Sequence, residues 1–191
     1  MRPAVFLDRD GTIIEESGYL DRLDRLVFFP YSVDAIRSLN RAGFAVVVVT
    51  NQAGIARGIV REAFVGEAHR HIAARVETGG GRIDGFYYCP HYPTGTVQEY
   101  VRACDCRKPG AGMFRQAAAD LDLDLARSYT VGDRWHDVEA AQAFGARGIL
   151  VRTGLGATEE RRDAGKASPA AIVDDLAAAA AWILEQSQQP A

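Results

Sequence analysis

The feature that most constrains this chain is a short apolar run that stops abruptly at two carboxylates, in residues 5–12 (VFLDRDGT). A run of Val, Phe and Leu predicts a central strand of a parallel sheet, because both faces of such a sheet are buried. Ligands of open α/β sheets bind in the crevice beyond the carboxyl ends of the strands. Asp8 and Asp10 therefore lie where chemistry is expected, although these residues alone fit a solvated Asx-type turn equally well.

The rest of the chain alternates between apolar runs and segments with helical spacing. Further strands are predicted at residues 45–49, 86–88, 129–131, 148–151 and 171–173. Helices are predicted at residues 33–42, 61–76, 112–121, 137–144 and 175–185, with Ser32 and Asp174 as N-terminal caps. This alternation predicts an open, Rossmann-like α/β sandwich of three layers around a central parallel sheet. Without repeats or linkers, we expect a single domain over residues 1–186 and a flexible tail at 187–191.

The charge balance and the apolar runs exclude several classes of function. The formal net charge is −3, and acidic and basic residues are mixed, so a broad basic surface for nucleic acid or an anionic membrane is not expected. No apolar run reaches the roughly 20 residues that span a bilayer. The first residues resemble no secretory signal. We expect a cytoplasmic protein that works as a monomer on a small metabolite.

Polar side chains follow three of the predicted strands, at Asp8 and Asp10, at Thr50 and Asn51, and at Asp133. A parallel sheet brings these strand ends to one edge. Hard cations such as Mg²⁺ prefer one or two carboxylates together with phosphate oxygens and water, which Asp8 and Asp133 can provide, with a backbone carbonyl near Asp10 as a further ligand. The set is typical of phosphoryl transfer.

Each of these residue types has a role in that chemistry. Lys108 can offset charge on a transferring phosphoryl group, and the Thr50 hydroxyl can hold one of its oxygens. Asp8, kept ionised by the metal, can attack phosphorus to give an aspartyl-phosphate. Asp10 can protonate the leaving oxygen and then activate the hydrolytic water.

All three cysteines fall in one segment, and a histidine lies among them. Cys89 and His91 form one pair, and Cys104 and Cys106 form another about a dozen residues later. Three thiols and one imidazole are the ligand set of a closed, structural zinc site. We expect zinc to close a loop over residues 89–106, and so to hold the adjacent Arg107 and Lys108 in place.

Four segments of the chain, in order, resemble the motifs of haloacid dehalogenase-type phosphatases. They are residues 8–12 (DRDGT), 50–51 (TN), 108–109 (KP) and 132–137 (GDRWHD). The resemblance implies that Asp8 is the nucleophile, Asp10 the acid/base and Lys108 the phosphoryl clamp, with Mg²⁺ on Asp8, Asp10 and Asp133. Asp137 corresponds to a further acid of the last motif. It either supports the metal or only caps a helix.

The zinc loop and residues 50–58 (TNQAGIARG) narrow this resemblance to the D-glycero-D-manno-heptose 1,7-bisphosphate phosphatases. Such an enzyme is capless and releases the C7 phosphate, in the synthesis of a lipopolysaccharide precursor. Without a cap, specificity must come from residues near the site. We expect substrate to contact the flap residues Glu16, Ser17, Gly18 and Tyr19, the residues Asn51 and Gln52, and the arginines Arg57, Arg107 and Arg134.

Two other functions are consistent with parts of this pattern. Histidinol-phosphate phosphatases are near relatives that share the zinc loop. A receiver-like signalling module also gathers acids, a Thr and a Lys at strand ends, but its phospho-acceptor follows a later strand. Among the remaining polar residues, His69 and His71 are expected at the surface of a helix, Trp135 in packing, and His136 at the edge of the site.

Overall fold

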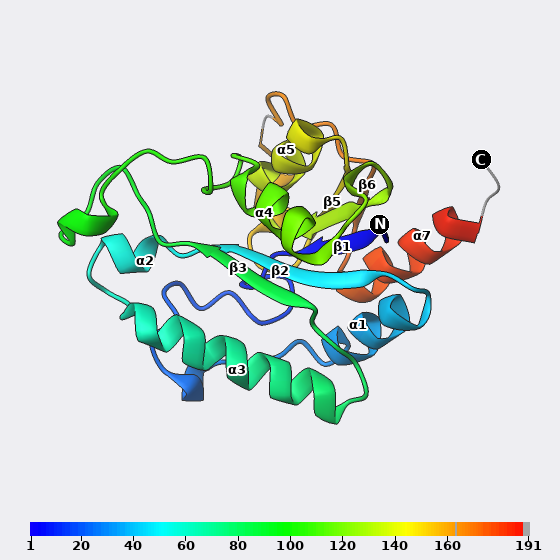
Figure 1. The fold of residues 1–191 in the computed structure, drawn as a ribbon, viewed down its shortest axis with the longest axis horizontal. Helices are drawn as coiled ribbons and strands as arrows, with labels where there is room; N and C mark the ends of the chain where they lie inside the picture. Colours follow the sequence, from blue (N-terminus) through cyan, green and yellow to red (C-terminus); the bar gives the residue numbers. More distant parts are fainter. Residues whose placement is uncertain (163, 189–191) are drawn as a thin grey trace.

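Six parallel strands form one sheet in the order β3-β2-β1-β4-β5-β6 (Figure 1). The structure is a computed structural model that describes residues 1–162 and 164–188. The strands are β1 (Ala4–Leu7), β2 (Ala45–Asn51), β3 (Gly85–Cys89), β4 (Tyr129–Gly132), β5 (Arg147–Val151) and β6 (Ala171–Val173). The strand order reverses at β1, so a crevice is expected beyond the carboxyl ends of β1 and β4.

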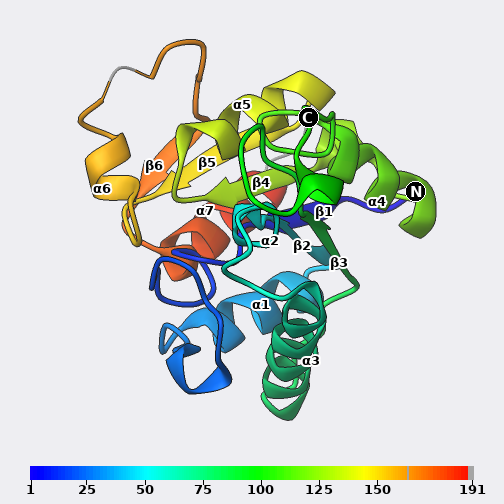
Figure 2. The ribbon, with the colours of Figure 1, turned by 90° about the vertical axis from the view of Figure 1, so that its left-hand side faces the viewer.

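Helices cover both faces of the sheet and produce the three predicted layers (Figures 1 and 2). Helices α1, α3 and α7 lie on one face, and α4 and α5 on the other. The helices are α1 (Ser32–Arg41), α2 (Ala53–Ala56), α3 (Glu62–Thr78), α4 (Gly112–Leu121), α5 (Trp135–Phe144), α6 (Gly156–Glu159) and α7 (Leu176–Gln188). Three 3-10 turns complete the set: η1 (Leu23–Arg25), η2 (Gln98–Tyr100) and η3 (Leu125–Arg127). The predicted α/β fold class is confirmed.

Side chains of β1 alternate between the two cores, as the pleat of a strand requires. Val5 and Leu7 pack with α1, α3 and α7, whereas Phe6 packs on the other face. There the Phe6 ring meets Phe114 and Phe144 edge to face, at centroid distances of 5.1 and 5.7 Å. The strand is buried on both sides, so its carboxyl end is held firmly at the edge where Asp8 follows.

The segments between elements are too short for a cap domain. Only η1 interrupts the chain from β1 to α1, and the chain from β2 to β3 forms α2 and α3. The carboxyl edge of the sheet is therefore open, as the capless prediction requires. In the part of the chain that the structure describes, no helix is both long and apolar enough to cross a membrane.

Two predicted helix caps are wrong. Ser32 is the first residue of α1, and its buried hydroxyl donates to the carbonyl oxygen of Ile13 at 2.7 Å. Asp175, and not Asp174, caps α7 by accepting a hydrogen bond from the backbone N–H of Ala178. Asp174 instead forms an ion pair with Arg152. In both cases a partner distant in sequence decides the role of the side chain.

The expectations for the last helix and for His69 also need correction. Helix α7 continues to Gln188, so residues 187 and 188 of the predicted tail are helical, and residues 189–191 lie outside the described residues. His69 is buried, with 7% of its surface exposed, because this face of α3 lies against β3 and the imidazole stacks on Phe86 at 4.7 Å. His71 is exposed as expected.

Candidate functional site

A pocket of about 440 Å³ opens at the carboxyl edge of the sheet. The predicted catalytic and substrate-binding residues that line it are Asp8, Asp10, Glu16, Gly18, Tyr19, Thr50, Asn51, Gln52, Arg57, Arg107 and Arg134. Tyr92 and His136 line it as well. Ser17 is not among the lining residues, and its carbonyl oxygen accepts a hydrogen bond from Arg25. Strand ends far apart in sequence thus meet around one cavity.

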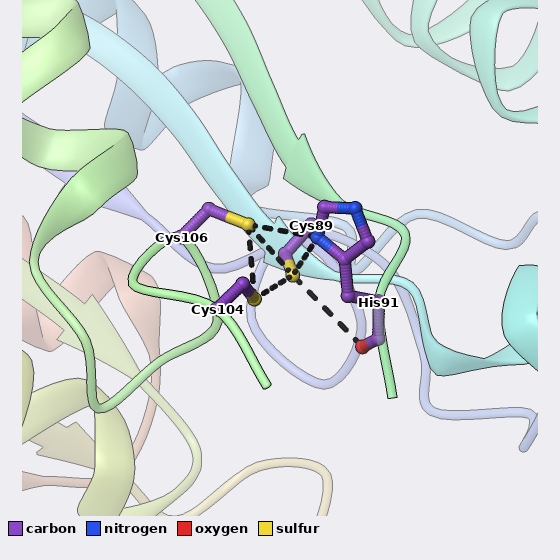
Figure 3. Close-up of side chains that lie close together, drawn as sticks. All are labelled: Cys89, His91, Cys104 and Cys106. Atoms are coloured by element: carbon purple, nitrogen blue, oxygen red, sulfur yellow. Dashed lines mark hydrogen bonds between the residues drawn. The ribbon is translucent and has the colours of Figure 1, made fainter. Parts of the chain in front are cut away.

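The predicted zinc ligands converge at the end of β3 (Figure 3). The Sγ atom of Cys106 lies 3.1 Å from that of Cys89, 3.2 Å from that of Cys104 and 3.2 Å from Nδ1 of His91. The Sγ atoms of Cys89 and Cys104 are 3.5 Å apart. In a tetrahedral site with Zn–S bonds of about 2.3 Å, two sulfurs are about 3.8 Å apart. The four ligands therefore fit zinc with a small expansion, and all three thiols are free of disulfides.

Three buried carboxylates form a second cluster, and Asp8 among them lines the pocket. Oxygens of Asp8, Asp133 and Asp137 lie within 4.8 Å of one another. Asp8 follows β1, and its backbone N–H donates to Val131 of β4, which places it directly beside Asp133. Asp137 belongs to the first turn of α5, where it accepts a hydrogen bond from the backbone N–H of Arg134. Asp137 is thus both a helix-end acid and a member of the cluster.

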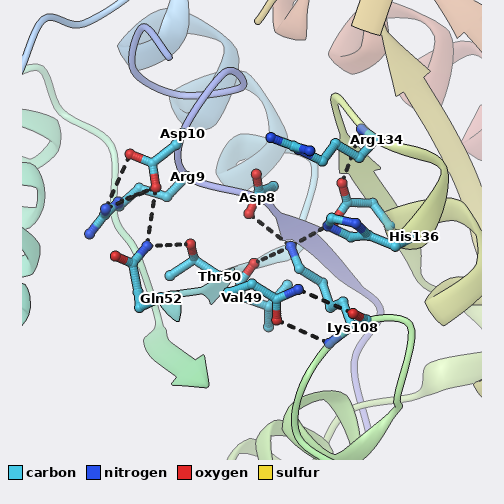
Figure 4. Close-up of polar contacts among 11 residues, drawn as sticks. Asp8, Arg9, Asp10, Val49, Thr50, Gln52, Lys108, Arg134 and His136 are labelled. Atoms are coloured by element: carbon cyan, nitrogen blue, oxygen red, sulfur yellow. Dashed lines mark hydrogen bonds and ion pairs between the residues drawn. The ribbon is translucent and has the colours of Figure 1, made fainter. Parts of the chain in front are cut away.

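Lys108 is the one cation in direct contact with these acids among the described residues. Its Nζ atom lies 2.7 Å from Asp8 and 2.5 Å from Asp137, and it donates to the carbonyl oxygen of Val49 (Figure 4). Burial opposes the charge, but the carboxylates of Asp137 and Asp8 raise the pKa of Lys108 above its usual range. Lys108 is therefore a fixed positive charge at the nucleophile.

Asn51 holds the backbone of Lys108 in place. Its side-chain amide donates to the carbonyl oxygen of Lys108 at 3.1 Å and accepts from the Lys108 N–H at 3.0 Å. These two bonds join the end of β2 to Lys108, two residues beyond the zinc loop. Asn51 also lines the pocket, and its amide keeps one N–H and one oxygen lone pair, so its contact with substrate stays a prediction.

The carboxylate of Asp10 points toward Arg9 and Gln52 and away from Asp8 (Figure 4). Its carboxylate accepts hydrogen bonds from Arg9 at 3.1 Å and from Nε2 of Gln52 at 3.1 Å. Arg9 is only 1% exposed and also forms an ion pair with Asp10 at 2.8 Å. The sequence pattern does not predict this role of Arg9, although Arg9 lies between the two acids in the chain. In this arrangement the side chain of Asp10 is not one of the clustered carboxylates.

The acid cluster has more negative charge than one lysine offsets. Burial raises the pKa of Asp8 in spite of Lys108, and Asp137 and Asp10 raise it further. Burial, together with Asp8 and Asp137, raises the pKa of Asp133 to about 8. The buried Oδ1 atom of Asp133 has no hydrogen-bond donor among residues 1–162 and 164–188. A hard divalent cation fits such a set of oxygens.

Two glycines are required by the close approach of these acids. Gly11 has a φ of +81°, and a Cβ atom there would lie 2.3 Å from Oδ2 of Asp133. A Cβ atom on Gly132 would lie 2.3 Å from the carboxylate of Asp137. A larger residue at either position would displace a carboxylate, so these glycines fix the depth at which the acids lie.

The flap and the motif around Asp133 complete the pocket wall. Glu16 accepts a hydrogen bond from the backbone N–H of Gly18 at 2.7 Å, and burial raises the pKa of Glu16. Arg25 donates to the carbonyl oxygens of Ser17 and Tyr19, which fixes the shape of the flap. Burial, and the charge of Lys108, lower the pKa of His136, so its ring is neutral near pH 7.

Comparison with known proteins identifies the family. A family model described as HAD-hydrolase-like matches residues 105–179. The chain is 46% identical over 164 residues to the D-glycero-beta-D-manno-heptose-1,7-bisphosphate 7-phosphatase of Escherichia coli, which covers 85% of this chain and 85% of that protein. The corresponding protein of Yersinia pestis is 42% identical over 177 residues, or 92% of each chain.

Solved structures agree with this assignment. The D,D-heptose 1,7-bisphosphate phosphatase of B. bronchiseptica, complexed with magnesium and phosphate, is 34% identical with a TM-score of 0.84, and the match covers 97% of this chain and 99% of that one. The chain therefore belongs to the haloacid dehalogenase-type phosphatases, in the family that includes the heptose bisphosphate phosphatases, and is a phosphoric monoester hydrolase.

Proposed function

We propose that this phosphatase removes the C7 phosphate of D-glycero-D-manno-heptose 1,7-bisphosphate and leaves the 1-phosphate. The observation that carries this proposal is the charge of the pocket. Asp8, which forms an ion pair with Lys108, lines the pocket together with Arg57, Arg107 and Arg134. In the described part of the chain, no carboxylate forms an ion pair with these three arginines. Such a pocket suits a substrate with two phosphates.

The reaction proceeds in two steps. Asp8 attacks the C7 phosphorus, so that an Asp8 O–P bond forms while the bond to the sugar oxygen breaks, and Asp10 gives that oxygen its proton. Asp10 then takes a proton from water, which attacks the aspartyl-phosphate and releases inorganic phosphate. Before either proton transfer, the side chain of Asp10 must rotate away from Arg9 and Gln52. The Thr50 hydroxyl and the Lys108 ammonium hold the phosphoryl oxygens throughout.

Magnesium is the cation that we propose for the acid cluster. Asp8 and Asp133 would hold it, with the backbone carbonyl of Asp10 as a further ligand and Asp137 beside it. A bound magnesium ion would offset negative charge on the phosphoryl group. Two observations support this assignment: among the described residues the Oδ1 atom of Asp133 has no hydrogen-bond donor, and the cluster has more carboxylates than cations.

We propose a structural zinc ion for Cys89, His91, Cys104 and Cys106. Four ligands fill a tetrahedron and leave no position for substrate. Zinc bound at Nδ1 of His91 leaves Nε2 as a donor, so we expect the exposed Arg102, now 2.6 Å from Nε2, to turn aside. Metal analysis of the purified protein is expected to find one zinc per chain. A fully active, zinc-free preparation would refute this assignment.

The walls of the pocket are proposed to recognise the sugar and its second phosphate. The flap residues Glu16, Gly18 and Tyr19 line the pocket, with Ser17 between them in the chain, and Gln52 and the three arginines line it as well. We also propose that the chain works as a monomer on this small metabolite.

A phosphate-release assay tests the substrate. Both anomers of the heptose bisphosphate and histidinol phosphate are compared at equal concentration, and we expect a bisphosphate anomer to have the highest kcat/KM. Histidinol phosphate has an ammonium group in place of a second phosphate, and the three arginines would repel it. Faster turnover of histidinol phosphate would contradict the proposal and establish the alternative.

A further inference from the structure

The ring of Tyr92 lies in the pocket wall beside two of the arginines. The Cζ atom of Arg57 is 4.4 Å from the centroid of this ring, and that of Arg107 is 4.8 Å away. A guanidinium group within about 6 Å of an aromatic centroid is attracted by the negative face of the ring. One tyrosine therefore binds two cations that are about 50 residues apart in sequence.

The backbone of Tyr92 is itself held firmly. Its N–H donates to the carbonyl oxygen of Tyr100 at 3.1 Å, and its carbonyl oxygen accepts from the N–H of Arg102 at 3.2 Å. Tyr92 directly follows His91 of the cysteine–histidine cluster. The ring thus projects from a fixed part of the loop over residues 89–106, and not from a free surface segment.

The same loop also holds the backbone of Arg57. Thr96 donates from its N–H to the carbonyl oxygen of Ala56 and from its hydroxyl to that of Arg57, both at 3.0 Å. Gly95 makes this contact possible, because a Cβ atom there would lie 2.1 Å from the Ala56 oxygen. The loop therefore fixes both the main chain of Arg57 and the ring on which its guanidinium rests.

Arg57 and Arg107 carry like charges on long side chains, and both guanidinium groups lie within 4.8 Å of one ring centroid. Such side chains have many rotamers, and mutual repulsion would favour those in which the guanidinium groups separate. Attraction to the Tyr92 ring, with a weaker contribution to Arg57 from the Tyr19 ring at 5.8 Å, keeps both groups in the pocket wall before substrate arrives. Fixing them in advance lowers the entropy that binding an anion would otherwise cost.

We propose that Tyr92 is a positioning residue that holds Arg57 and Arg107 as a paired guanidinium site for the phosphate that is not cleaved. This inference rests on the proposed function, because it requires a substrate with two phosphates. Tyr92 acts through the arginines and touches none of the reacting atoms. It therefore determines affinity for the bisphosphate, and not the rate of the chemical step.

The test compares Tyr92→Leu, which removes the π face, with Tyr92→Phe, which keeps it. Kinetics are measured with the heptose bisphosphate and with p-nitrophenyl phosphate, a monoester without a second phosphate. For Tyr92→Leu we expect the KM for the bisphosphate to rise about 10-fold, with kcat within about twofold. The KM for the monoester is expected to change by less than about twofold, and Tyr92→Phe is expected to restore the bisphosphate KM.

Tyr31→Leu is the matched control, since Tyr31 is a half-buried tyrosine of the groove between α1 and α7, away from the pocket. Equal loss with both substrates, failure of Tyr92→Phe to restore KM, or an unchanged bisphosphate KM in Tyr92→Leu would each overturn the inference. If wild-type enzyme does not prefer the bisphosphate, the proposed function fails and the inference with it. If wild-type enzyme does prefer it and Tyr92→Leu behaves like wild type, the inference alone is wrong.

Discussion

At the scale of single residues, the acid cluster determines what the site can do. Asp8, Asp133 and Asp137 share one ammonium group, so two of the three carboxylates remain to be offset if all are ionised. Burying such charges destabilises the metal-free protein. The same excess of negative charge attracts a divalent cation. The carboxylates that destabilise the metal-free protein are therefore the ones that bind the metal.

Asp8→Asn is expected to lower phosphate release by at least about 10³-fold, because the amide is a poor nucleophile. Stability without added metal is expected to stay the same or rise, since the variant removes a buried charge whose pKa is already raised. Phosphate-release assays and thermal melts measure the two effects. Asp34→Asn changes an exposed acid of α1 and serves as the control. Appreciable turnover by Asp8→Asn would rule out Asp8 as the nucleophile.

His69 makes stability depend on pH. Burial, and the charge of Arg9, lower its pKa to about 3, compared with 6.5 in the unfolded chain. Below pH 6.5 the unfolded chain therefore binds one more proton than the folded one, and stability falls as the pH falls towards 3. This residue alone is expected to remove about 2 kcal/mol between pH 7 and pH 5.

The variant His69→Gln tests this prediction, because glutamine does not titrate. Urea unfolding at pH 7 and pH 5 gives the free energy of unfolding for both proteins. The loss on acidification is expected to be about 2 kcal/mol smaller in the variant, and His71→Gln, at an exposed histidine, is expected to behave like wild type. An equal loss in His69→Gln and wild type would mean that His69 is protonated in the folded protein.

At the scale of elements, α3 fixes the zinc loop through one carboxylate. Glu62, the first residue of α3, accepts hydrogen bonds from the hydroxyls of Tyr88 in β3 and Tyr100 in η2, at 2.9 and 2.5 Å. The backbone carbonyl oxygen of Tyr100 in turn accepts a hydrogen bond from the N–H of Tyr92. A chain of contacts therefore leads from a core helix to the pocket wall.

Glu62→Ala is expected to destabilise the protein by about 2 kcal/mol, because two half-buried hydroxyls lose a charged acceptor. The free energy of unfolding in urea measures this change. Glu67→Ala removes an exposed acid of the same helix and is expected to cost less than about 0.5 kcal/mol. Equal effects of the two variants would show that the Glu62 contacts add nothing to stability.

Sequence patterns predict the elements well where burial has a clear period. The strand at residues 171–173 and the helix at residues 112–121 have the bounds that the structure gives them. Helix α2 has only four residues, too few for a periodic signal. Asp175 caps α7, but its neighbour Asp174 has the same propensity to cap a helix. The ion pair of Asp174 with the distant Arg152 decides which of the two caps the helix.

The site was predictable to the extent that its residues follow strand ends. Asp8 and Asp133 meet because a parallel sheet aligns those ends, and Lys108 joins them because Asn51, at the end of β2, holds its backbone. The burial of Arg9 beside its neighbour Asp10, and the place of Tyr92 beside two arginines, depend on side-chain packing across the chain. No local pattern records such packing.

At the scale of the whole molecule, we propose that residues 1–186 fold as one unit. One sheet contributes to the cores on both of its faces. The two tryptophans report on opposite layers, since Trp135 belongs to α5 and Trp182 to α7. If the chain is a single cooperative unit, the surroundings of both tryptophans are lost in the same unfolding transition.

Trp135→Phe and Trp182→Phe each leave one tryptophan and make this testable. Urea unfolding of each variant is followed by fluorescence and by far-UV circular dichroism. Within each variant the two transitions are expected to have midpoints within about 0.2 M of each other, because one sheet joins the layers. Separate midpoints would show that the layers unfold independently.

The burial of Lys108 has a practical consequence for chemical labelling. Lys108 and Lys166 are the two lysines in the sequence. Lys166 is exposed, whereas the ammonium group of Lys108 is enclosed and held protonated by two carboxylates. Amine-reactive reagents are electrophiles that a neutral, accessible amine attacks, so a dye or a solid support would attach at Lys166 or at the amino terminus. Covalent immobilisation through amines therefore leaves the phosphoryl clamp intact.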